Sequence, residues 1–337
     1  MILITGGAGY IGSHVVKELL RQNQELIIVD NLSTGSQRTL DELSKIKSFE
    51  FIQEDLKNFD AIEKIFKTYN IHTVIHFAAS IVVPESIEDP LKYYMNNTVN
   101  TTNLVKCAVL HGVEKFIFSS TAAVYGEPTN MPQNGIDEEF ETHPINPYGM
   151  SKLMSENVIR DVAKANERFK YVIFRYFNVA GADIHYNEKH LQPRIGQSFP
   201  NATHLIKIAS EAASAKREKI YVFGDDYPTS DGTCIRDYIH VDDLANAHIL
   251  AIDYLDNNES DTFNCGYGQG SSVKEVIETM KKVTQNDFTV INAPRRAGDP
   301  SALIANNSKI KTKMHWKPKY DDLELICESA YMWENDK

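Results

Sequence analysis

The chain has 337 residues, enough for one large α/β unit or two closely joined domains. Hydrophobic residues make up 42% and charged residues 24%, the balance of an ordinary globular protein. The formal charge of −11 argues against a general nucleic-acid-binding protein, because phosphate affinity depends on clustered Lys and Arg. A local basic pocket for an anionic small ligand remains compatible with that charge.

A glycine-rich turn follows the first apolar run, at residues 2–4, and precedes a stretch of helical periodicity that ends near Leu20. Its spacing is Gly6-x-x-Gly9-x-x-Gly12. Glycines in such a turn let the backbone bend tightly and let a pyrophosphate approach the positive end of the helix. The order of strand, glycine turn and helix predicts a dinucleotide-binding unit.

An acidic residue, Asp30, ends the second apolar run, at residues 26–29. A carboxylate there accepts hydrogen bonds from the 2′-OH of the adenosine ribose. A 2′-phosphate would meet its negative charge, and the next Arg is Arg38. The sequence therefore predicts NAD as cofactor, in preference to NADP.

Strand-like and helix-like stretches alternate through the first half of the chain. Strands are expected near residues 49–52, 73–77, 115–118 and 171–174, and helices near 61–69, 91–110 and 147–165. This alternation predicts a Rossmann-type, doubly wound parallel sheet covered by helices. Beyond Asn178 the pattern changes to a long loop at residues 181–201 and then to a smaller α/β lobe, with helices near 204–215, 241–255, 273–284 and 323–333. We expect an NAD-binding domain at 1–178 and a nucleotide-sugar-binding lobe at 179–337, some of whose elements return to the first domain.

The four cysteines are scattered without C-x-x-C spacing, which favours buried reduced thiols over disulfides or zinc knuckles. The chain opens directly into a strand, and no apolar run approaches ~18–20 residues. We therefore expect a cytoplasmic protein without a membrane partner. His185, His190 and His204 lack a ligand acid at a metal-site spacing, so no metal is expected.

A tyrosine and a lysine four residues apart, Tyr148 and Lys152, begin the predicted helix at 147–165 and share one of its faces. A phenol of pKa near 10 is a poor base at neutral pH, and a nearby ammonium lowers that pKa. A hydroxyl-rich segment, Ser119-Ser120-Thr121, follows the strand at 115–118, at the sheet edge where ligands bind. The combination predicts proton transfer at a substrate hydroxyl.

Taken together, these motifs resemble those of the UDP-glucose 4-epimerases in the extended short-chain dehydrogenase/reductase superfamily. The resemblance extends to His76-Phe77-Ala78-Ala79, to Arg175-Tyr176-Phe177-Asn178 and to the long segment from Gly224 to Val241. It implies a reversible inversion at carbon 4 of UDP-galactose and UDP-glucose, through a transient 4-keto sugar and enzyme-bound NAD. In that pattern Tyr148 is the base, Lys152 lowers its pKa and Thr121 aligns the proton path.

The resemblance also implies two sets of ligand contacts. The expected NAD contacts are Gly6, Gly9, Tyr10, Ile11, Gly12, Asp30, Asn31, Asp55, Leu56, Phe77, Ala78, Asn96, Lys152 and Tyr176. For Asp55 and Asn96 a structural role as a turn or helix cap is an equal alternative. The expected contacts of the UDP-sugar substrate are Thr121, Tyr148, Asn178, Leu205, Phe223, Arg236, Arg296 and Asp299, the two arginines serving the diphosphate.

Three departures from the family pattern concern substrate contacts. Ile81 stands where many relatives have Lys, Lys207 stands where proline is usual, and the loop at 184–201 is unlike theirs. Leu303 occupies a place where relatives differ in size, so the sequence leaves open whether N-acetylated or other UDP-sugars are accepted. A homodimer that pairs the helices at 91–110 and 147–165 is implied. Apolar residues such as Leu91, Val99, Leu104 and Leu153 allow it, although core packing explains many of them equally well.

Two other functions remain as alternatives. A sugar-nucleotide dehydratase or decarboxylase of the same fold is one, but dehydratases need a further acid and base to eliminate the 6-OH. Relatives of that type carry an acidic residue just after the central Thr, where this chain has Ala122-Ala123. A non-catalytic NAD-binding regulator is the other, and the presence of both Tyr148 and Lys152 argues against it.

Overall fold

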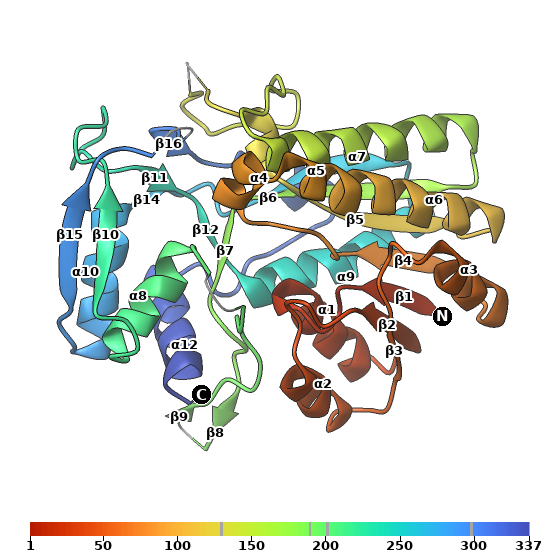
Figure 1. Cartoon of the computed structure of the whole chain (residues 1–337), viewed down its shortest axis with the longest axis horizontal. Helices are drawn as coiled ribbons and strands as arrows, with labels where there is room; N and C mark the ends of the chain where they lie inside the picture. The colour runs from red at the N-terminus through yellow and green to blue at the C-terminus, as the bar shows by residue number, and fades with distance from the viewer. Residues whose placement is uncertain (129–130, 189, 200–201, 297–298, 337) are drawn as a thin grey trace. The chain divides into compact units, whose positions relative to one another are not determined.

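The computed structural model describes residues 1–128, 131–188, 190–199, 202–296 and 299–336 (Figure 1). The chain divides into two compact units, each built from three segments. The first unit comprises Met1–Gly126, Glu141–Arg175 and Ala245–Phe263, and the second comprises Glu127–Phe140, Tyr176–Leu244 and Asn264–Lys337. The chain thus enters each unit three times.

A seven-stranded sheet forms the framework of the first unit, in the order β13-β6-β5-β4-β1-β2-β3. Its strands are β1 (Ile2–Thr5), β2 (Leu26–Asp30), β3 (Glu50–Gln53), β4 (Thr73–His76), β5 (Lys115–Thr121), β6 (Lys170–Tyr176) and β13 (Asp261–Cys265). The pairings of β1 with β2 and β4, of β2 with β3 and of β4 with β5 are parallel. The strand order reverses between β1 and β4, the place where ligands bind in doubly wound sheets. The predicted Rossmann-type fold is confirmed.

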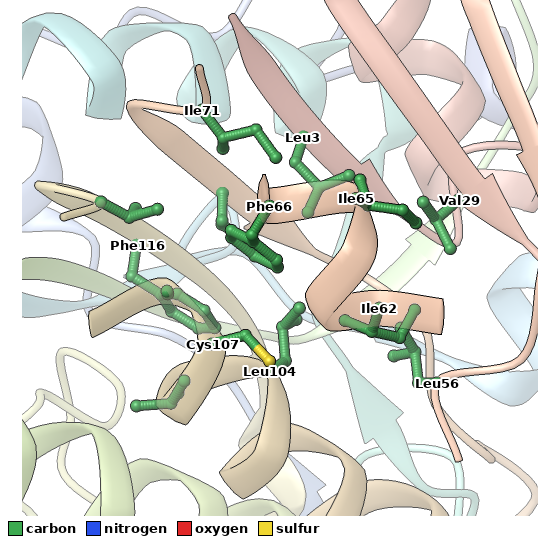
Figure 2. Packing of buried hydrophobic residues seen from close by; sticks show 14 of the residues in the cluster. Leu3, Val29, Leu56, Ile62, Ile65, Phe66, Ile71, Leu104, Cys107 and Phe116 are labelled. Atoms are coloured by element: carbon green, nitrogen blue, oxygen red, sulfur yellow. The ribbon is translucent and has the colours of Figure 1, made fainter. Parts of the chain in front are cut away.

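One face of this sheet carries an extended apolar core (Figure 2). The core helices are α3 (Phe59–Thr68), α6 (Asn100–Leu110) and α7 (Pro147–Ala165). On α3 the buried residues Ile62, Ile65 and Phe66 follow the i, i+3, i+4 spacing of an amphipathic helix. Leu3 of β1 and Phe116 of β5 meet them from the sheet. Burial of each such side chain contributes about 1.5–3 kcal/mol, so this core fixes the strand ends that carry the site.

The opposite face of the sheet packs on α1 (Tyr10–Arg21) and α9 (Val241–Asn257), whose first four residues belong to the second unit. Because side chains alternate between the two faces of a strand, Ile4 of β1 points to this opposite face. There, a Cβ added to Gly7, in the turn before α1, would lie 3.2 Å from Cγ2 of Ile4. The ring of His248 on α9 lies 4.9 Å from that of Phe77 and 4.8 Å from that of Phe174 on β6. Residues 245–263 therefore complete the first unit although they follow most of the second in sequence.

The predicted helix at 91–110 is not one regular helix. It is divided into α5 (Pro90–Tyr93), a π-helical segment η1 (Tyr94–Val99) and α6. The first unit also contains α2 (Gln37–Ser44), α4 (Val83–Glu88) and the 3₁₀ helix η2 (Ala122–Tyr125). Single π-helical turns inside α-helices are frequent at functional sites, and Asn97 in η1 bonds to the backbone of Ser80 and to Ser151 Oγ.

The second unit contains small sheets and helices. Its strands are β7 (Asn178–Ala180), β8 (Tyr186–Asn187), β9 (His190–Leu191), β10 (Lys219–Phe223), β11 (Ile235–Arg236), β12 (Tyr238–His240), β14 (Ser271–Ser272), β15 (Thr289–Ala293) and β16 (Ala302–Leu303). Its helices are α8 (Leu205–Ala213), α10 (Val273–Thr284), α11 (Ser308–Lys313) and α12 (Leu323–Asn335). Ile220 and Val222 of β10 pack with Ala212 of α8 and Ile277 of α10.

The predicted loop at 181–201 contains the short antiparallel pair of β8 and β9. Of the idiosyncratic segment 184–201, residues 189, 200 and 201 lie outside the described residues. No helix among the described residues is long and apolar enough to cross a membrane. All four cysteines are buried free thiols, as predicted.

Candidate active site

The glycine turn between β1 and α1 leaves no space for side chains. Gly6 has φ +73°, and a Cβ there would lie 2.7 Å from the backbone nitrogen of Ala78. A Cβ on Gly12 would lie 2.3 Å from the carbonyl oxygen of Gly6. The N-cap residue of α1 is Gly9, so no side chain caps this helix end. The turn is a cradle of backbone N–H groups at a helix N-terminus, which suits the pyrophosphate of a dinucleotide.

Asp30 lies at the carboxyl end of β2 beside this turn and is 7% exposed. Its Oδ2 accepts a hydrogen bond from the backbone of Ala8 at 3.0 Å, and its Oδ1 accepts one from Leu32 at 2.8 Å. Burial raises the pKa of Asp30, and these two bonds partly oppose the rise. Two carboxylate oxygens offer about four acceptor sites, so two remain for a ribose diol. The residues present therefore fit NAD.

The neighbouring predicted NAD contacts have structural partners as well. Asn31 donates to Asp55 Oδ2 at 3.0 Å, and Asp55 Oδ1 accepts from the backbone of Lys57. Burial acts to raise the pKa of Asp55, but these hydrogen bonds outweigh it and lower the pKa overall. Asn96 donates to Ser80 Oγ at 3.0 Å and accepts from Asn100. Asp55 thus caps a turn, and Asn96 makes structural hydrogen bonds. The contacts of both residues with NAD stay predictions.

The remaining predicted NAD contacts fall in different surroundings. Leu56 is buried within the apolar core, so its side chain is committed to packing. Phe77 and Ala78 directly follow β4, and Tyr10 and Ile11 open α1. Tyr176 ends β6 and belongs to the second unit.

Helix α7 starts where it does because of two local signals. The side chain of Asn146 caps it by accepting from the backbone of Gly149 at 2.8 Å, and Pro147 occupies the first turn. This start places Tyr148 in the first turn and Lys152 one turn later. A Cβ on Gly149 would lie 2.6 Å from the carbonyl oxygen of Ala123. Glycine between the two catalytic candidates therefore allows α7 to approach the segment that follows β5.

Tyr148 and Thr121 interact through their side-chain hydroxyl groups. Burial raises the pKa of the Tyr148 phenol, and the interaction with Thr121 opposes that rise. Thr121 ends β5, is 9% exposed and accepts from the backbone of Ala123 at 3.1 Å. The hydroxyl of Thr121 and the phenol of Tyr148 therefore lie side by side at the end of a central strand.

Lys152 is 3% exposed, an unusual degree of burial for an ammonium. Its Nζ donates to the carbonyl oxygen of Ser119 at 2.7 Å and lies 4.9 Å from the centre of the Phe118 ring. Burial lowers the pKa of Lys152 to about 7, although the nearby carboxylate of Glu156 acts to raise it. The structure brings together the predicted trio of Thr121, Tyr148 and Lys152.

The predicted substrate residues of the second unit form two groups. Asn178 and Leu205 line one cavity together with His204, Lys207 and Trp333. The others form two contact pairs, one at the end of β11 and one at the end of β10. Arg236 donates to Asp299 Oδ1 at 3.4 Å, and the Arg296 guanidinium lies 3.6 Å from the centre of the Phe223 ring.

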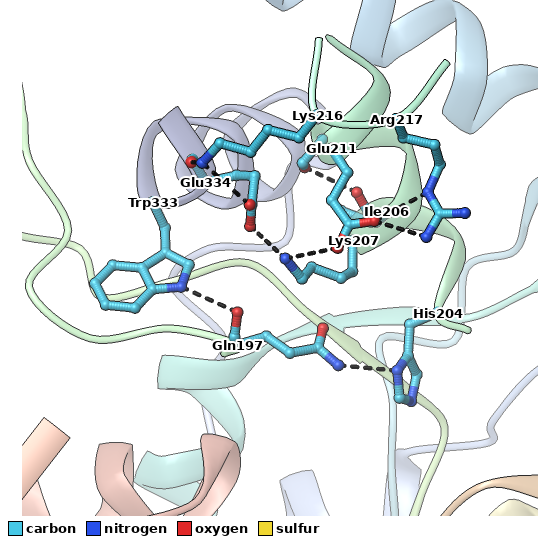
Figure 3. Close-up of polar contacts among 10 residues, drawn as sticks. Gln197, His204, Ile206, Lys207, Glu211, Lys216, Arg217, Trp333 and Glu334 are labelled. Carbon is cyan, nitrogen blue, oxygen red and sulfur yellow. Dashed lines mark hydrogen bonds and ion pairs between the residues drawn. The ribbon is translucent and has the colours of Figure 1, made fainter. Parts of the chain in front are cut away.

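The departure at Lys207 is accommodated inside the second unit (Figure 3). Its ammonium is buried and pairs with Glu211 at 3.0 Å and with Glu334 of α12. Lys216 also pairs with Glu334. α8 begins at Leu205, so a lysine at its third position is compatible with a regular helix start. Ile81, the other departure, is 41% exposed.

Comparison with known proteins identifies the family. The profile of the NAD dependent epimerase/dehydratase family matches residues 2–266. A UDP-glucose 4-epimerase from Halalkalibacterium halodurans is 46% identical over 336 residues, which cover 99% of this chain and 96% of that protein. This chain belongs to the NAD dependent epimerase/dehydratase family. The resemblance to UDP-glucose 4-epimerases predicted from the motifs is confirmed.

Solved structures of family members extend the comparison. The UDP-Glc/GlcNAc 4-epimerase from Campylobacter jejuni is 55% identical, with a TM-score of 0.86, over 100% of this chain and 99% of that one. A UDP-glucose 4-epimerase from Bifidobacterium longum, in complex with NAD+ and UDP, is 37% identical. Its TM-score is 0.92, over 99% of this chain and 98% of that one.

The sequence analysis did not identify two buried charged residues that lie beside Lys152 and the end of β5. Glu156 is fully buried one turn after Lys152, and Arg175 of β6 is bonded to it. Arg175 belongs to the Arg175-Tyr176-Phe177-Asn178 motif, which by itself does not indicate a role for this residue. A Glu at i+4 from Lys152 on the predicted helix was the available signal. Among the described residues, no group of three His, Cys, Asp or Glu side chains could hold a metal ion.

Proposed function

We propose that this chain interconverts UDP-galactose and UDP-glucose by inverting the configuration at carbon 4 of the sugar. The observation that carries the proposal is the pairing of the Tyr148 phenol with the Thr121 hydroxyl, one helical turn from a buried Lys152. A relative 46% identical over nearly the whole chain is a UDP-glucose 4-epimerase. Both the chemistry of the site and this relative support the same reaction.

Tyr148 takes the proton from the sugar 4-OH and returns it in the second half of the reaction. Burial favours the neutral phenol, so the phenolate needs compensation from nearby positive charge. Lys152 supplies that charge from the same helical face, and Thr121 orients the phenol oxygen. NAD, when bound, supplies the hydride acceptor and donor at carbon 4.

The two ligands are assigned to different parts of the chain. Residues 1–178 bind NAD, mainly through the glycine turn, Asp30 and Lys152. Residues 179–337 bind the nucleotide sugar, with Arg236 and Arg296 contacting the diphosphate. A guanidinium matches phosphate oxygens with paired hydrogen bonds, and the Arg236 side chain is only 12% exposed, which strengthens such bonds.

A dehydratase function is less well supported. Ala122 and Ala123 follow Thr121, so these two positions offer no acid for eliminating the 6-OH. The reaction proposed here needs one proton-transfer group at carbon 4, and Tyr148 provides it.

We also propose a homodimer that forms through the helices at 91–110 and 147–165. Leu91, Met95 and Val99 are 73%, 58% and 37% exposed and lie four residues apart on α5 and η1. Met154 on α7 is 41% exposed. Such an apolar stripe on a folded surface is typical of an interaction site. Leu104 is 1% exposed within the core, so core packing, the alternative to an interface role, accounts for this residue.

A cytoplasmic location is proposed from the cysteines. All four are buried free thiols, a pattern that suits a reducing compartment. Fractionation of the source cells with an antibody to the protein tests it, and recovery outside the cytoplasm would reject it.

The proposed reaction is tested by incubating the purified protein with UDP-galactose and measuring UDP-glucose. The expected result is conversion without added cofactor, and loss of conversion in Tyr148→Phe. UDP-N-acetylgalactosamine is assayed as a second compound, because the Campylobacter jejuni relative is described as a UDP-Glc/GlcNAc 4-epimerase. An active preparation that converts only the N-acetylated sugar would overturn the substrate assignment, and no conversion of either would overturn the reaction.

A further inference from the structure

Glu156 is a carboxylate with no exposed surface in the middle of α7. It accepts hydrogen bonds from Ser120 Oγ, from Arg160 Nη2 at 2.7 Å and from Arg175. Arg175 contributes two of these bonds, from Nε at 3.2 Å and from Nη2 at 2.8 Å. A buried carboxylate with this many charged and neutral donors is fixed in place and held ionised. Burial acts to raise its pKa, but Arg175, Arg160 and Ser120 outweigh that and lower it.

The partners of Glu156 connect it with the catalytic trio. Ser120 lies between Ser119, whose carbonyl oxygen accepts from Lys152, and Thr121, which interacts with Tyr148. Arg175 also donates from Nη1 to Tyr125 Oη at 2.9 Å, at the end of the 3₁₀ helix that starts beyond Thr121. A single carboxylate on α7 thus holds the end of β5 and, through Arg175, the segment that follows it.

The charge of Glu156 acts on Lys152 because the two lie at i and i+4 on one helix. The titratable groups that face Lys152 come from two elements. Glu156 lies on α7 and His76 lies on β4; Tyr148 shares this face of α7 by its i, i+4 spacing from Lys152. Burial, and secondly the charge of Lys152, lower the pKa of His76 to about 3, so His76 is neutral. β5 contributes only neutral groups, the Ser119 carbonyl and the Phe118 ring, to the contacts described.

We propose that Glu156 is a positioning residue for proton transfer at Tyr148: it holds the Ser119–Thr121 end of β5 against α7 and supplies the negative charge that stabilises the Lys152 ammonium. The proposal rests on the proposed epimerase function. It gives a role to the ion-pair network of Glu156, Arg160 and Arg175, none of which exchanges a proton with the substrate in the proposed reaction.

The electrostatic part of the proposal has a definite sign. Removing a buried anion makes it easier for Lys152 to lose its proton, so its pKa falls. As the pH is raised, the variant then loses the ammonium, and the activity that depends on it, at a lower pH than wild type does. In Glu156→Gln, which keeps the shape of the side chain, we expect the alkaline limb of the kcat–pH profile to move down by about one pH unit.

Arg160→Gln is the matched control, since it breaks a bond to the same carboxylate but removes a cation. Arg160 also donates to Thr262 Oγ1 at 3.2 Å, and its side chain is 23% exposed. Loss of its positive charge raises the pKa of Lys152, so the alkaline limb moves to higher pH, by less because the group is partly solvated. General damage to the fold would not produce shifts of opposite sign.

The experiment compares wild type, Glu156→Gln, Glu156→Asp and Arg160→Gln as NAD-loaded enzymes with UDP-galactose. Glu156→Asp keeps the charge but shortens the reach, so the alkaline limb should stay in place while kcat falls. The protonation of Lys152 is followed independently by NMR of lysine-labelled protein, the signal being assigned by its loss in Lys152→Met. This titration does not depend on turnover.

The outcomes separate the two proposals. An inactive wild type would overturn the epimerase function. An active wild type whose Lys152 titrates at the same pH in Glu156→Gln would overturn the role of Glu156, as would shifts of the same sign in Glu156→Gln and Arg160→Gln. If Glu156→Gln does not fold, the other two variants test the proposal. It is rejected if the alkaline limb of Arg160→Gln does not move to higher pH, or if that of Glu156→Asp moves.

Discussion

The Nζ of Lys152 donates to the carbonyl oxygen of Ser119 at 2.7 Å, which ties the helix of the proposed base to the end of the central strand β5. An ammonium has three donors, so this bond leaves two for other partners. The phenolate of Tyr148 and a ribose hydroxyl of NAD are the partners that the proposed reaction needs. The same bond orients the ammonium before either ligand binds, which reduces the reorganisation needed during proton transfer.

Replacing Tyr148 with Phe tests the base directly. General acid–base groups contribute about 10²–10⁴-fold, or roughly 3–5 kcal/mol, so we expect kcat to fall by that factor. UDP binding should survive, because the phenyl ring keeps its edge contact with Tyr93, whose ring centre is 6.3 Å away. Stopped assays with UDP-galactose and calorimetry with UDP measure the two quantities. Tyr93→Phe is the matched control and should keep kcat within a few-fold of wild type. Near-normal turnover in Tyr148→Phe would assign the proton to another group.

Thr121 tests whether a hydroxyl is needed beside the phenol. Thr121→Ser keeps the hydroxyl and should be mild. Thr121→Val has almost the same shape but cannot bond to Tyr148, so the phenol pKa rises and kcat falls by about tenfold or more. The comparison is made on kcat–pH profiles of both variants. Equal activity in Ser and Val variants would show that Thr121 only caps the turn at Ala123.

The burial of Lys152 predicts a dependence of stability on pH. Its pKa is lowered from 10.5 to about 7, so between these values the unfolded chain binds more protons than the folded one. Stability therefore rises with pH across that window as the cost of burying the charge is relieved. That cost, roughly 3–5 kcal/mol at about 1.4 kcal/mol per unit, is fully present below pH 7.

The measurement is the free energy of urea unfolding of the NAD-free protein at pH 7 and pH 9, for wild type and Lys152→Met. Taking the difference between the two proteins removes the contribution of all other groups. Wild type should gain more stability from pH 7 to pH 9 than Lys152→Met does. Equal gains would show that Lys152 titrates normally in the folded state.

The glycine turn makes a prediction about NAD. Gly12→Ala puts a methyl group 2.3 Å from the Gly6 carbonyl oxygen, so the turn must open and NAD should be lost during purification. Asp30→Ala should also weaken NAD retention because the ribose loses its acceptor. Gly112→Ala is the control: its φ of +72° imposes strain of about 1–2 kcal/mol, but no atom lies within 4 Å of the added Cβ. The NAD content of denatured supernatants is measured. Full retention in Gly12→Ala, or dependence on added NADP, would contradict the assignment.

The local parts of the site were predictable from sequence because they depend on short spacing. Gly6, Gly9 and Gly12 form a turn within one βα unit, and Tyr148 and Lys152 share a face by helical periodicity. The network of Glu156 and Arg175 could not be predicted from sequence, because its members meet only when α7 and β6 pack together. The same holds for Gly149, whose need for close approach to Ala123 depends on the path of η2.

The organisation of the fold shows the same division. Helical periodicity between residues 91 and 110 predicted the location of the helix but not its π-helical turn, which accompanies the bonds from Asn97 to Ser80 and Ser151. Nor could it separate Leu104, which is buried, from Leu91, which is 73% exposed. Residues 245–263 join the first unit only through packing such as that of His248 on Phe174.

Arg236 is predicted to govern substrate binding. Arg236→Lys keeps the charge but loses the paired hydrogen bonds to phosphate, so we expect UDP to bind about 10–100-fold more weakly, with a smaller change in kcat. Arg295→Lys is the matched control, because Arg295 pairs with Asp226 at 2.6 Å on the surface. This variant should bind UDP as tightly as wild type does. Calorimetry with UDP measures both. Unchanged binding in Arg236→Lys would remove Arg236 from the diphosphate site.

The exposed apolar stripe predicts the dimer. Leu91→Asp combined with Met95→Lys places two charges where a partner helix would bury them, at a cost of several kcal/mol, so the dimer should dissociate. Each side chain is more than half exposed in the single chain, so the fold of the monomer should be unaffected. Sedimentation at micromolar concentration should show a dimer for wild type and a monomer for the variant.

Tyr221→Lys in the second unit is the control for this experiment. Tyr221 is 40% exposed on β10, outside the predicted dimer helices, so its replacement removes a comparable apolar surface without touching them. This variant should remain a dimer. A dimer that survives the Leu91 and Met95 changes but dissociates in Tyr221→Lys would move the interface to the second unit. A monomeric wild type would instead mean that the stripe on α5 and η1 is an apolar surface without a second copy of the chain to cover it.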